Sequence, residues 1–339
     1  MILVSVDELR RLCVRSLESV GARTDEAKIV AENLVKADLR GTNSHGVFRL
    51  PEYLERVKRG LINISTEIEI IREGPSFAVI DGKAKFGQVV GTRAMDLAIS
   101  KGKKAGLALV TVSKSNHFGI ASYYSMFALK HMMIGIVMSN AAPSMAPWGA
   151  KEKLFGTNPL SVAIPTGGPI PIVLDMAMSQ VARGKIRMAA DKGERIPEGW
   201  AVDKEGRATT DPVAALEGSL APIAGAKGSG LAIVIDVLCG VLSGGTYGNG
   251  VKSMYDMTGP CGTCNTMIAI DISKFIPVDR FTEQVKAMIG AIKGSSLASG
   301  FSRIFLPGEI EIETERNRLT QGIPFEEETW ARLNRLLDA

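Results

Sequence analysis

The spacing of apolar residues changes once along this chain, and this change constrains the fold more than any other feature. Up to about residue 60, apolar residues such as Leu9, Leu12 and Leu17 recur at helical spacing. Beyond residue 65 the pattern alternates and breaks into short apolar runs, which predict strands mixed with helices. From 324 to 337 it is charged and helical again. We therefore expect an α/β protein whose mixed-sheet middle is inserted between helical ends.

Capping and turn residues place the expected elements. Ser5 and Glu8 form a capping box for a first helix, which Gly21 ends. Thr24 is expected to cap a second helix. Further helices are expected at about 47–58, 88–104, 119–130, 228–242 and 280–292. The expected strands are 67–71, 77–80, 107–112, 134–138, 160–164, 172–174 and 267–270.

Length and composition fit a globular protein. The chain has 339 residues, of which 45% are hydrophobic and 22% charged, enough to bury a sizeable core. We expect two domains. Residues 1–70 plus 300–339 would form a helical domain that carries a proton-transfer motif, and residues 71–299 would form a mixed α/β domain that binds a dinucleotide.

Charge and hydropathy exclude several classes of protein. The net charge is only +4 and basic runs are short, so we expect no nucleic-acid partner. The longest apolar stretches, such as Ser229 to Val241, are too short to cross a membrane. Met1 to Val4 runs directly into a charged helix and does not resemble a signal peptide, so we expect a cytoplasmic protein.

The four cysteines do not suggest a disulfide framework in a chain of this length. Cys261 and Cys264 form a single C-x-x-C motif. A zinc site would need a second pair of ligands at a suitable spacing, and neither cysteines nor histidines supply it. We therefore expect no metal, and we assign this motif no role.

Two of the three histidines lie in compact polar motifs, whereas His131 does not. His45 lies in Gly41-Thr-Asn-Ser-His-Gly46, and His117 lies in Lys114-Ser-Asn-His-Phe-Gly119. The pKa of a free imidazole is the closest of all side chains to neutrality, so histidine is well suited to act as a general acid or base. This arrangement indicates an enzyme.

The first motif offers Ser44 and His45 together, with Arg49 one helical turn later. An imidazole beside a guanidinium suits a 2-oxo or 2-hydroxy acid, because arginine binds carboxylates bidentately. The alternative is structural: Asn43 and Ser44 would cap the next helix and His45 would pack there. A serine hydrolase is disfavoured, since adjacent residues point apart and no G-x-S-x-G motif is present.

Several loops follow predicted strands or precede predicted helices. The 114–119 motif lies at a strand-to-helix turn, where polar or anionic ligands are favoured, although Ser115 and Asn116 could simply cap the helix. Gly225 to Gly230 could approach a pyrophosphate closely. Neither G-x-G-x-x-G nor a P-loop is present, so any dinucleotide would bind without the ordinary Rossmann turn. Together with the polar loops 140–143, 156–159 and 175–177, these turns suggest one lined cleft.

Taken together, the motifs resemble the second type of malate/L-lactate dehydrogenase family, which does not have a Rossmann fold. The resemblance covers nearly the whole chain. It runs through residues 41–49, 115–119, 154–159, 175–177, 182–186, 197–200, 227–228 and 307–309. It implies an unusual α/β fold that is normally homodimeric, and hydride transfer between NAD or NADP and a small 2-oxo or 2-hydroxy acid.

The resemblance also implies roles for individual residues. His45 would carry the proton with Ser44 as helper, and His117 is the second candidate for that role. Arg49 would bind the substrate carboxylate, with Thr157 nearby. The cofactor-binding residues would be His117, Phe118, Gly119, Asn140, Asp175, Met176, Ala177, Lys227, Gly228, Pro307, Gly308 and Glu309.

The resemblance leaves the substrate open. Malate or L-lactate is the first expectation, and ureidoglycolate or L-sulfolactate is the alternative. In the cyclic imine acid reductases of the family an aspartate falls in the segment matching Gly184 to Ile186, where this chain has Lys185. This difference argues against imine reduction. The alternative from another class is a non-catalytic dinucleotide-binding protein. Ser44, His45 and Arg49 argue against it, because such a protein would have no need of them.

Overall fold

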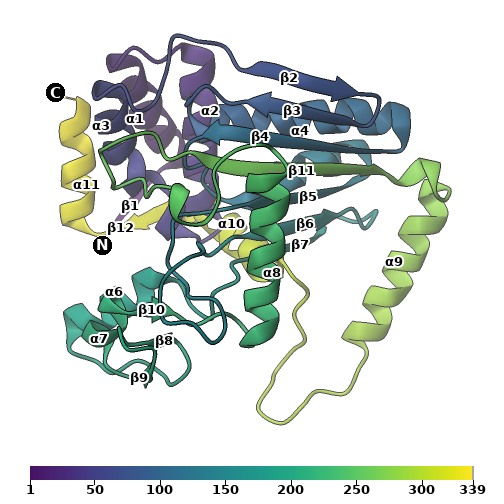
Figure 1. The fold of residues 1–339 in the computed structure, drawn as a ribbon. Helices are drawn as coiled ribbons and strands as arrows, with labels where there is room; N and C mark the ends of the chain where they lie inside the picture. The colour runs from purple at the N-terminus through teal and green to yellow at the C-terminus, as the bar shows by residue number, and fades with distance from the viewer. Residues whose placement is uncertain (338–339) are drawn as a thin grey trace.

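The computed structural model describes residues 1–337 and centres on a mixed sheet of seven strands (Figure 1). The strands are β2 (Glu69–Gly74), β3 (Phe77–Asp81), β4 (Leu107–Ser115), β5 (Met133–Ser139), β6 (Leu160–Ile164), β7 (Ile172–Met176) and β11 (Thr263–Asp271). They are ordered β2-β3-β4-β11-β5-β6-β7. Only β3 and β4 pair in parallel, so the expected mixed sheet is confirmed.

Helices cover both faces of this sheet. In Figure 1, α4 (Gly87–Ala105) lies behind the sheet and α8 (Ala226–Asp236) lies in front of it. The remaining helices are α1 (Val6–Ser19), α2 (Thr24–Leu39), α3 (Leu50–Lys58), α5 (Ala121–Ser125), α6 (Arg183–Lys192), α7 (Pro212–Glu217), α9 (Val278–Lys293), α10 (Glu309–Gln321) and α11 (Glu327–Asn334). One core cluster joins α4 to the sheet strands.

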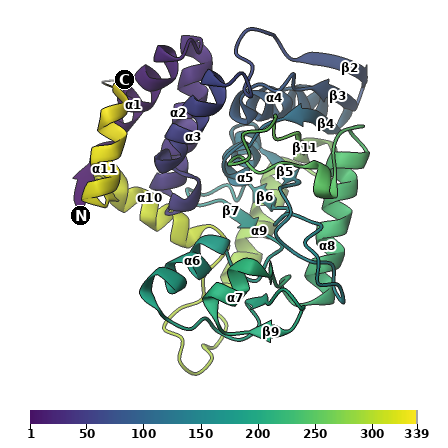
Figure 2. The same cartoon turned by 60° about the vertical axis from the view of Figure 1, so that its left-hand side comes forward.

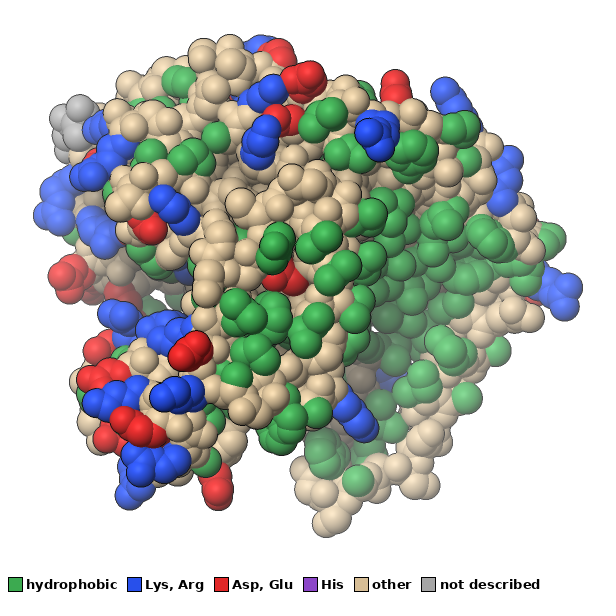
Figure 3. Space-filling model, in the orientation of Figure 1, with side chains coloured by type: hydrophobic (Ala, Val, Ile, Leu, Met, Phe, Trp, Pro, Cys, Tyr) green, Lys and Arg blue, Asp and Glu red, His purple; other side chains and the backbone are tan. Residues whose placement is uncertain are grey.

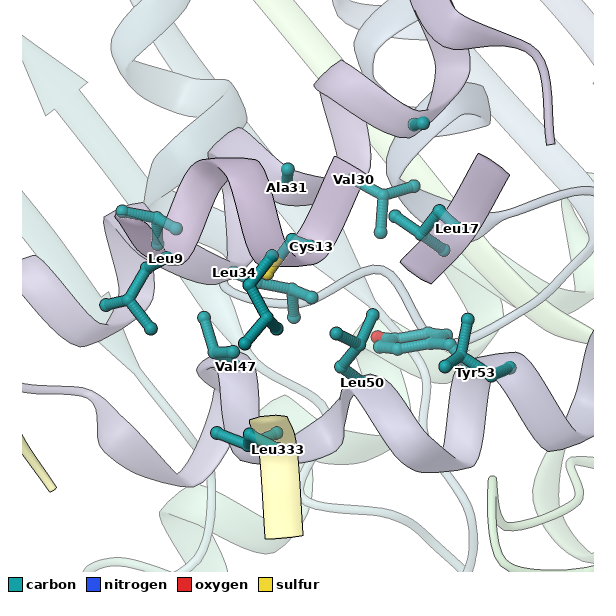
Figure 4. Packing of buried hydrophobic residues seen from close by; sticks show 14 of the residues in the cluster. Leu9, Cys13, Leu17, Val30, Ala31, Leu34, Val47, Leu50, Tyr53 and Leu333 are labelled. Atoms are coloured by element: carbon teal, nitrogen blue, oxygen red, sulfur yellow. The ribbon is translucent and has the colours of Figure 1, made fainter. Parts of the chain in front are cut away.

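The N-terminal helices share a core of their own beside the sheet (Figure 4). Leu9 and Leu17 of α1 pack there with Leu34 of α2, and all three are buried, as the helical spacing predicts. Leu333 of α11 packs against the same cluster. The two ends of the chain therefore meet, although the division into two domains at residues 70 and 300 stays a prediction.

The termini are joined by a small sheet that the local pattern does not reveal. β1 (Ile2–Val4) pairs antiparallel with β12 (Ile323–Phe325), and Leu3 lies opposite Pro324. The expectation of helix from residue 324 is therefore wrong at its start, since α11 begins only at Glu327. Figure 2 shows both termini at the same end of the molecule. A three-residue strand is stabilised by its distant partner, which explains why sequence periodicity misses it.

Three other expectations need correction. The residue at the N-cap of α2 is Arg23, because the Thr24 hydroxyl donates instead to Glu18 at 2.6 Å. The helix expected at 119–130 begins only at Ala121, since Gly119 has a left-handed φ of +80°, and it continues as a 3-10 helix from Met126. α8 changes into a π-helical turn at Val237–Val241.

The region between β7 and α8 contains short elements that the sequence analysis did not identify. Besides α6 and α7, it holds a three-stranded sheet of β8 (Ala201–Val202), β9 (Ala208–Thr209) and β10 (Ser219–Leu220). Two-residue strands carry no readable alternation. Over residues 1–337, none of the helices has the length and apolar character needed to cross a bilayer.

Candidate active site

His45 lies in the connection between α2 and α3, which forms two 3-10 turns, Asn43–His45 and Val47–Arg49. The buried carboxylate of Asp38 holds the second turn by accepting the Val47 backbone N–H at 2.7 Å. A Cβ on Gly46 would lie 1.9 Å from Asp38 Oδ1, so only glycine fits there. Asp38 of α2 therefore fixes the connection that carries His45. The N-cap residue of α3 is Arg49, so Asn43 and Ser44 do not cap this helix through their side chains.

His117 lies in the loop that follows β4, and this loop is anchored by its neighbour Asn116. The Asn116 amide donates to Ala84 O at 2.7 Å and accepts the backbone N–H of Cys261 at 3.0 Å. The N-cap residue of α5 is Ile120, so the alternative in which Ser115 and Asn116 cap this helix is wrong. Asn116 instead positions the loop that carries His117.

Gly119 closes this loop against α2. Its φ is +80°, and a Cβ there would lie 1.8 Å from Oδ1 of the buried Asn33. We expect Gly119→Ala to lower the free energy of unfolding by at least about 2 kcal/mol, because backbone strain and a steric clash add. Chemical denaturation would measure this loss.

The matched control for this prediction is Gly60→Ala. Gly60 also has a positive φ, of +68°, but no atom lies within 4 Å of its added Cβ. This variant should lose only about 1 kcal/mol, the conformational cost alone. Equal losses in the two variants would contradict a close approach of Gly119 to α2.

The structure brings the two motif histidines together at one cavity of about 220 Å³. Their ring centroids are 5.4 Å apart and the rings are stacked, with planes 21° apart. The predicted residues that line this cavity are His45, Arg49, His117, Phe118, Gly119, Asn140 and Thr157. Ser44 is adjacent, with its Oγ 2.9 Å from His45 Nδ1. The pocket is smaller than a typical pocket for a drug-sized molecule, so its size suits a small acid.

Arg49 presents a positive charge to this cavity. Its Nε donates to Ser44 O at 2.9 Å, and its Nη1 donates to the Tyr255 hydroxyl at 2.6 Å and faces Met254 Sδ at 2.9 Å. Over residues 1–337, no carboxylate lies within 4.0 Å of its guanidinium nitrogens. The charge of Arg49 is therefore available to an anionic ligand.

Both histidines are neutral at pH 7 in this environment. Burial, and then the charge of Arg49, lowers the pKa of His45 to about 4. Burial likewise lowers the pKa of His117 far below its usual range, with smaller contributions from His45, Arg49 and Arg56. A carboxylate bound at Arg49 would offset that positive charge and raise both pKa values.

A further part of the cavity wall comes from residues 252–261, which the sequence analysis missed. Lys252, Met254, Tyr255 and Cys261 line the cavity. The loop is held by Arg56 of α3, a fully buried side chain whose guanidinium donates to Asp256 O at 2.8 Å and Gly259 O at 2.9 Å. No local motif marks these residues, because they meet only in the folded chain.

The C-x-x-C motif is split by the fold. Both cysteines are buried, but Cys261 lines the cavity, whereas Cys264 lies beside Thr246, with its Sγ 3.5 Å from Thr246 O. Both cysteines are free thiols. Cys261 therefore contributes to the cavity wall, and that the motif has no role stays a prediction.

Asn140 lies at the cavity, but its side-chain amide is already engaged within the protein. The amide group donates to Asp236 Oδ1 at 3.0 Å and to Thr246 O at 2.8 Å, and its oxygen accepts the Cys264 N–H at 2.8 Å. All of its donors are used. Asn140 therefore fixes the loop after β5, and it offers a ligand mainly surface rather than a free amide.

The other predicted cofactor-binding segments lie outside the cavity wall. Asp175 lies in β7 and accepts the Ser122 N–H at 3.0 Å; Met176 ends the strand, and Ala177 follows it. The next residue, Met178, donates its N–H to Thr157 O at 2.7 Å, so this segment leads directly to the cavity.

Two further predicted segments lie near this one. Pro307 O accepts the Val173 N–H at 2.9 Å, which places Pro307, Gly308 and Glu309 beside β7. Lys227 is exposed in the first turn of α8, and a Cβ on Gly228 would meet Ile223 O at 2.2 Å. The close approach of Ile223 O therefore explains the glycine at position 228 on structural grounds.

A larger cavity of about 930 Å³ lies between the loop 146–151 and the small sheet. Its charged lining residues are Lys151, Glu198 and Glu205, and Trp148 forms part of the wall. None of the predicted catalytic or substrate-binding residues lines it. Volume alone does not mark the chemical site, and the smaller cavity with its titratable groups is the better candidate.

Comparison with known proteins agrees with this geometry. Residues 4–334 match the family model described as malate/L-lactate dehydrogenase. A malate dehydrogenase from Pyrococcus abyssi is 44% identical over 338 residues, covering 97% of this chain and 92% of the relative. The structure of sulfolactate dehydrogenase from Methanocaldococcus jannaschii has a TM-score of 0.95 at 40% identity, covering 99% of this chain and 97% of that one.

A further relative is the ureidoglycolate dehydrogenase (NAD(+)) of Escherichia coli K12, which is 35% identical and covers 94% of this chain and 91% of its own length. Fold, cavity and relatives together define an oxidoreductase that acts on hydroxy acids. The chain belongs to the malate/L-lactate dehydrogenase family, as the motifs predicted.

Proposed function

We propose that the cavity between His45, His117 and Arg49 is the active site, where a small 2-oxo acid is reduced or the matching 2-hydroxy acid is oxidised. The observation that carries this proposal is the guanidinium of Arg49, which has no carboxylate partner within residues 1–337, beside a neutral imidazole in one small cavity. Arg49 binds the carboxylate through paired hydrogen bonds, and Thr157 lines the same cavity.

His45 is the proton carrier in this account. In the oxidation direction the base must be neutral, and a pKa of about 4 keeps His45 neutral at pH 7. In the reduction direction His45 must bring a proton to the oxygen on C2, and the carboxylate at Arg49 helps by raising the pKa of the imidazole. Ser44 supports both states, because its hydroxyl can donate to His45 Nδ1 or accept from it.

The residues of the cavity fit a nicotinamide cofactor. The lining residues Phe118, Gly119, Ala141, Ala142 and Pro159 provide a mostly apolar wall, suited to a planar ring. Bound there, the cofactor NAD or NADP would supply or take the hydride. Asn140, Asp175, Met176, Ala177, Lys227, Gly228, Pro307, Gly308 and Glu309 are the residues proposed to hold its remainder. The segment 175–178 contacts the cavity residue Thr157 through the Met178 N–H, which supports such a role.

The reaction type can be tested by isotope transfer. Reduced cofactor that carries deuterium at both C4 positions of the dihydronicotinamide is incubated with the protein and a 2-oxo acid. The 2-hydroxy acid formed should contain one deuterium atom at C2, which mass spectrometry detects. A product without deuterium, formed at the same rate, would rule out direct hydride transfer.

For the substrate we propose malate or L-lactate first, with ureidoglycolate and L-sulfolactate as alternatives. Arg49 and Lys252 both line the cavity, which favours an acid with more than one anionic or polar group. Lys185, which separates this chain from the imine reductases, is exposed on α6.

That the protein lies in the cytoplasm stays a prediction from sequence.

We also propose a homodimer. An apolar stripe on α8 and the π-helical turn after it is exposed, namely Leu231, Val234, Val237 and Val241, each about half exposed. Figure 3 shows hydrophobic side chains gathered over this face of the molecule. Exposed apolar patches of this kind mark interaction sites, and a symmetric second copy would cover this one with its own α8.

Val234→Asp is expected to shift the protein from dimer to monomer, because it places a charge at the centre of this stripe. Size-exclusion chromatography with light scattering measures the mass. The control is Ile71→Asp on strand β2, which changes an apolar side chain that is 55% exposed, against 52% for Val234. A monomeric wild type, or dissociation by the control alone, would contradict an interface through α8.

A further inference from the structure

Each active-site histidine has a hydroxyl at its Nδ1 atom, but the two hydroxyls differ in their freedom. Ser44 Oγ lies 2.9 Å from His45 Nδ1, is exposed, and has no second partner within residues 1–337. The Tyr53 hydroxyl lies 2.6 Å from His117 Nδ1 and is buried. Gln88, which is also fully buried, donates its amide nitrogen to the same hydroxyl at 2.7 Å.

The protons in this chain of contacts can be counted. Because the amide of Gln88 donates to the Tyr53 oxygen, the single hydroxyl hydrogen of Tyr53 is free to point at His117 Nδ1. If Nδ1 carried the proton instead, the Tyr53 oxygen would accept two hydrogen bonds, and its own buried hydrogen would have no acceptor among the described residues. The arrangement therefore favours His117 Nδ1 as the acceptor. Since His117 is neutral, its one ring proton lies on Nε2. No side chain among residues 1–337 bonds to that Nε2, and the ring lines the cavity.

Resting on the proposed active site, we propose that Tyr53 and Gln88 are positioning residues that hold His117 as its Nε2–H tautomer. His117 is then a fixed N–H donor to a carbonyl oxygen of the bound ligand. It cannot take up a proton at Nε2, which is already occupied, or at Nδ1, which faces Tyr53. His45, whose serine partner can rotate, is left as the group that carries the proton.

The same geometry explains why the tyrosine does not take part as an acid. Burial raises the pKa of Tyr53 well above its usual value, so a transfer of its proton to His117 would leave a buried phenolate at a high cost. The pair therefore orients His117 without exchanging protons with it. Residues that hydrogen-bond the non-ligating nitrogen of a metal-bound histidine have a similar role, because they fix the tautomer of that ring.

Nitrogen-15 NMR of the histidine rings tests the proposal in the free protein, independently of any activity. The chain has only three histidines, so the spectrum is simple. His131→Asn removes the exposed ring that lies beside Lys103 and assigns its signals. His117 should show a protonated Nε2 and an unprotonated Nδ1, with no change across neutral pH. A protonated Nδ1, as expected if Gln88 accepted from Tyr53, would overturn the proposal.

Variants extend the test to catalysis. Tyr53→Phe keeps the aromatic ring but removes the hydroxyl, and should give His117 a mixture of tautomers. We expect kcat/KM to fall roughly 10- to 100-fold, mainly through kcat, the usual effect of losing such a supporting contact. Gln88→Met should act in the same direction, and it serves if the first variant fails to fold. An unchanged tautomer in a folded variant of either kind would contradict the assignment.

The matched control is Tyr123→Phe. Tyr123 is a half-buried tyrosine on α5 that packs on Tyr124 and Phe127 and makes no side-chain hydrogen bond within the described residues. Loss of its hydroxyl should change neither the His117 tautomer nor kcat.

Ligand addition tests the donor role of His117 in two steps. Reduced cofactor is added first, and a non-reducible analogue such as oxamate is added second. A shift of the His117 Nε2 signal in the first step would indicate a bond to a cofactor carbonyl, and a shift in the second step a bond to a substrate oxygen. No shift in either step would contradict the donor role.

Discussion

Replacing His45 with alanine is expected to slow the chemical step roughly 10²- to 10⁴-fold, the usual contribution of a positioned general acid or base. His45 is the only imidazole of the cavity whose Nδ1 partner can rotate, and it lies beside the proposed carboxylate-binding Arg49. The variant should still bind the cofactor, because the apolar wall around Phe118 is untouched. Single-turnover kinetics with saturating cofactor measures the effect.

The control for this variant is His131→Ala, which removes an exposed histidine whose side-chain hydrogen bond within the described residues is with Lys103. It should have wild-type rates. If His45→Ala turned over at nearly the wild-type rate with cofactor binding intact, the proton would have to be carried by another group, and His117 would be the first candidate.

Replacing Arg49 with alanine is expected to lower kcat/KM for the oxo acid roughly 10- to 200-fold, since hydrogen bonds to a charged group are worth about 1.5–3 kcal/mol. Most of the loss should appear in KM, because the guanidinium binds the carboxylate in ground and transition states alike. Arg49→Lys keeps the charge without the bidentate geometry, and should recover only part of the affinity.

Loss of Arg49 also removes its contacts with Tyr255 and Met254, so its effect on the loop must be separated from its effect on the substrate. Arg59→Ala is the control, since Arg59 is an exposed arginine at the end of α3 that pairs with Glu55. A variant at Arg49 whose affinity for a neutral substrate analogue falls as much as that for the acid would indicate damage to the cavity rather than loss of the carboxylate contact.

The parts of the fold that local physics determines could be predicted from the sequence. The apolar stripe of α1 and the short apolar runs of the sheet follow from periodicity, and both are found as expected. The pairing of β1 with β12 joins residues more than 300 positions apart, and a three-residue strand has no stability of its own. Such elements depend on tertiary contacts and could not be predicted.

The site shows the same division. His45, Arg49 and His117 lie in motifs that can be recognised, and they do meet at one cavity. Tyr53 lies at a helical core position, where its spacing predicts only burial. Gln88 and Arg56 act through contacts with segments far along the chain, so nothing near them in the sequence indicates a role.

The measurement that tests the central claim most directly is nicotinamide absorbance. NADH and NADPH are each offered to the protein with oxaloacetate, pyruvate, sulfopyruvate and a cyclic imine acid. We predict oxidation of one cofactor by at least one of the oxo acids, which would identify both substrate class and cofactor. Oxidation with the imine alone would show that Lys185 was misread. Tight cofactor binding without turnover of any of these acids, or of oxalurate, would contradict the account and favour a non-catalytic dinucleotide-binding protein.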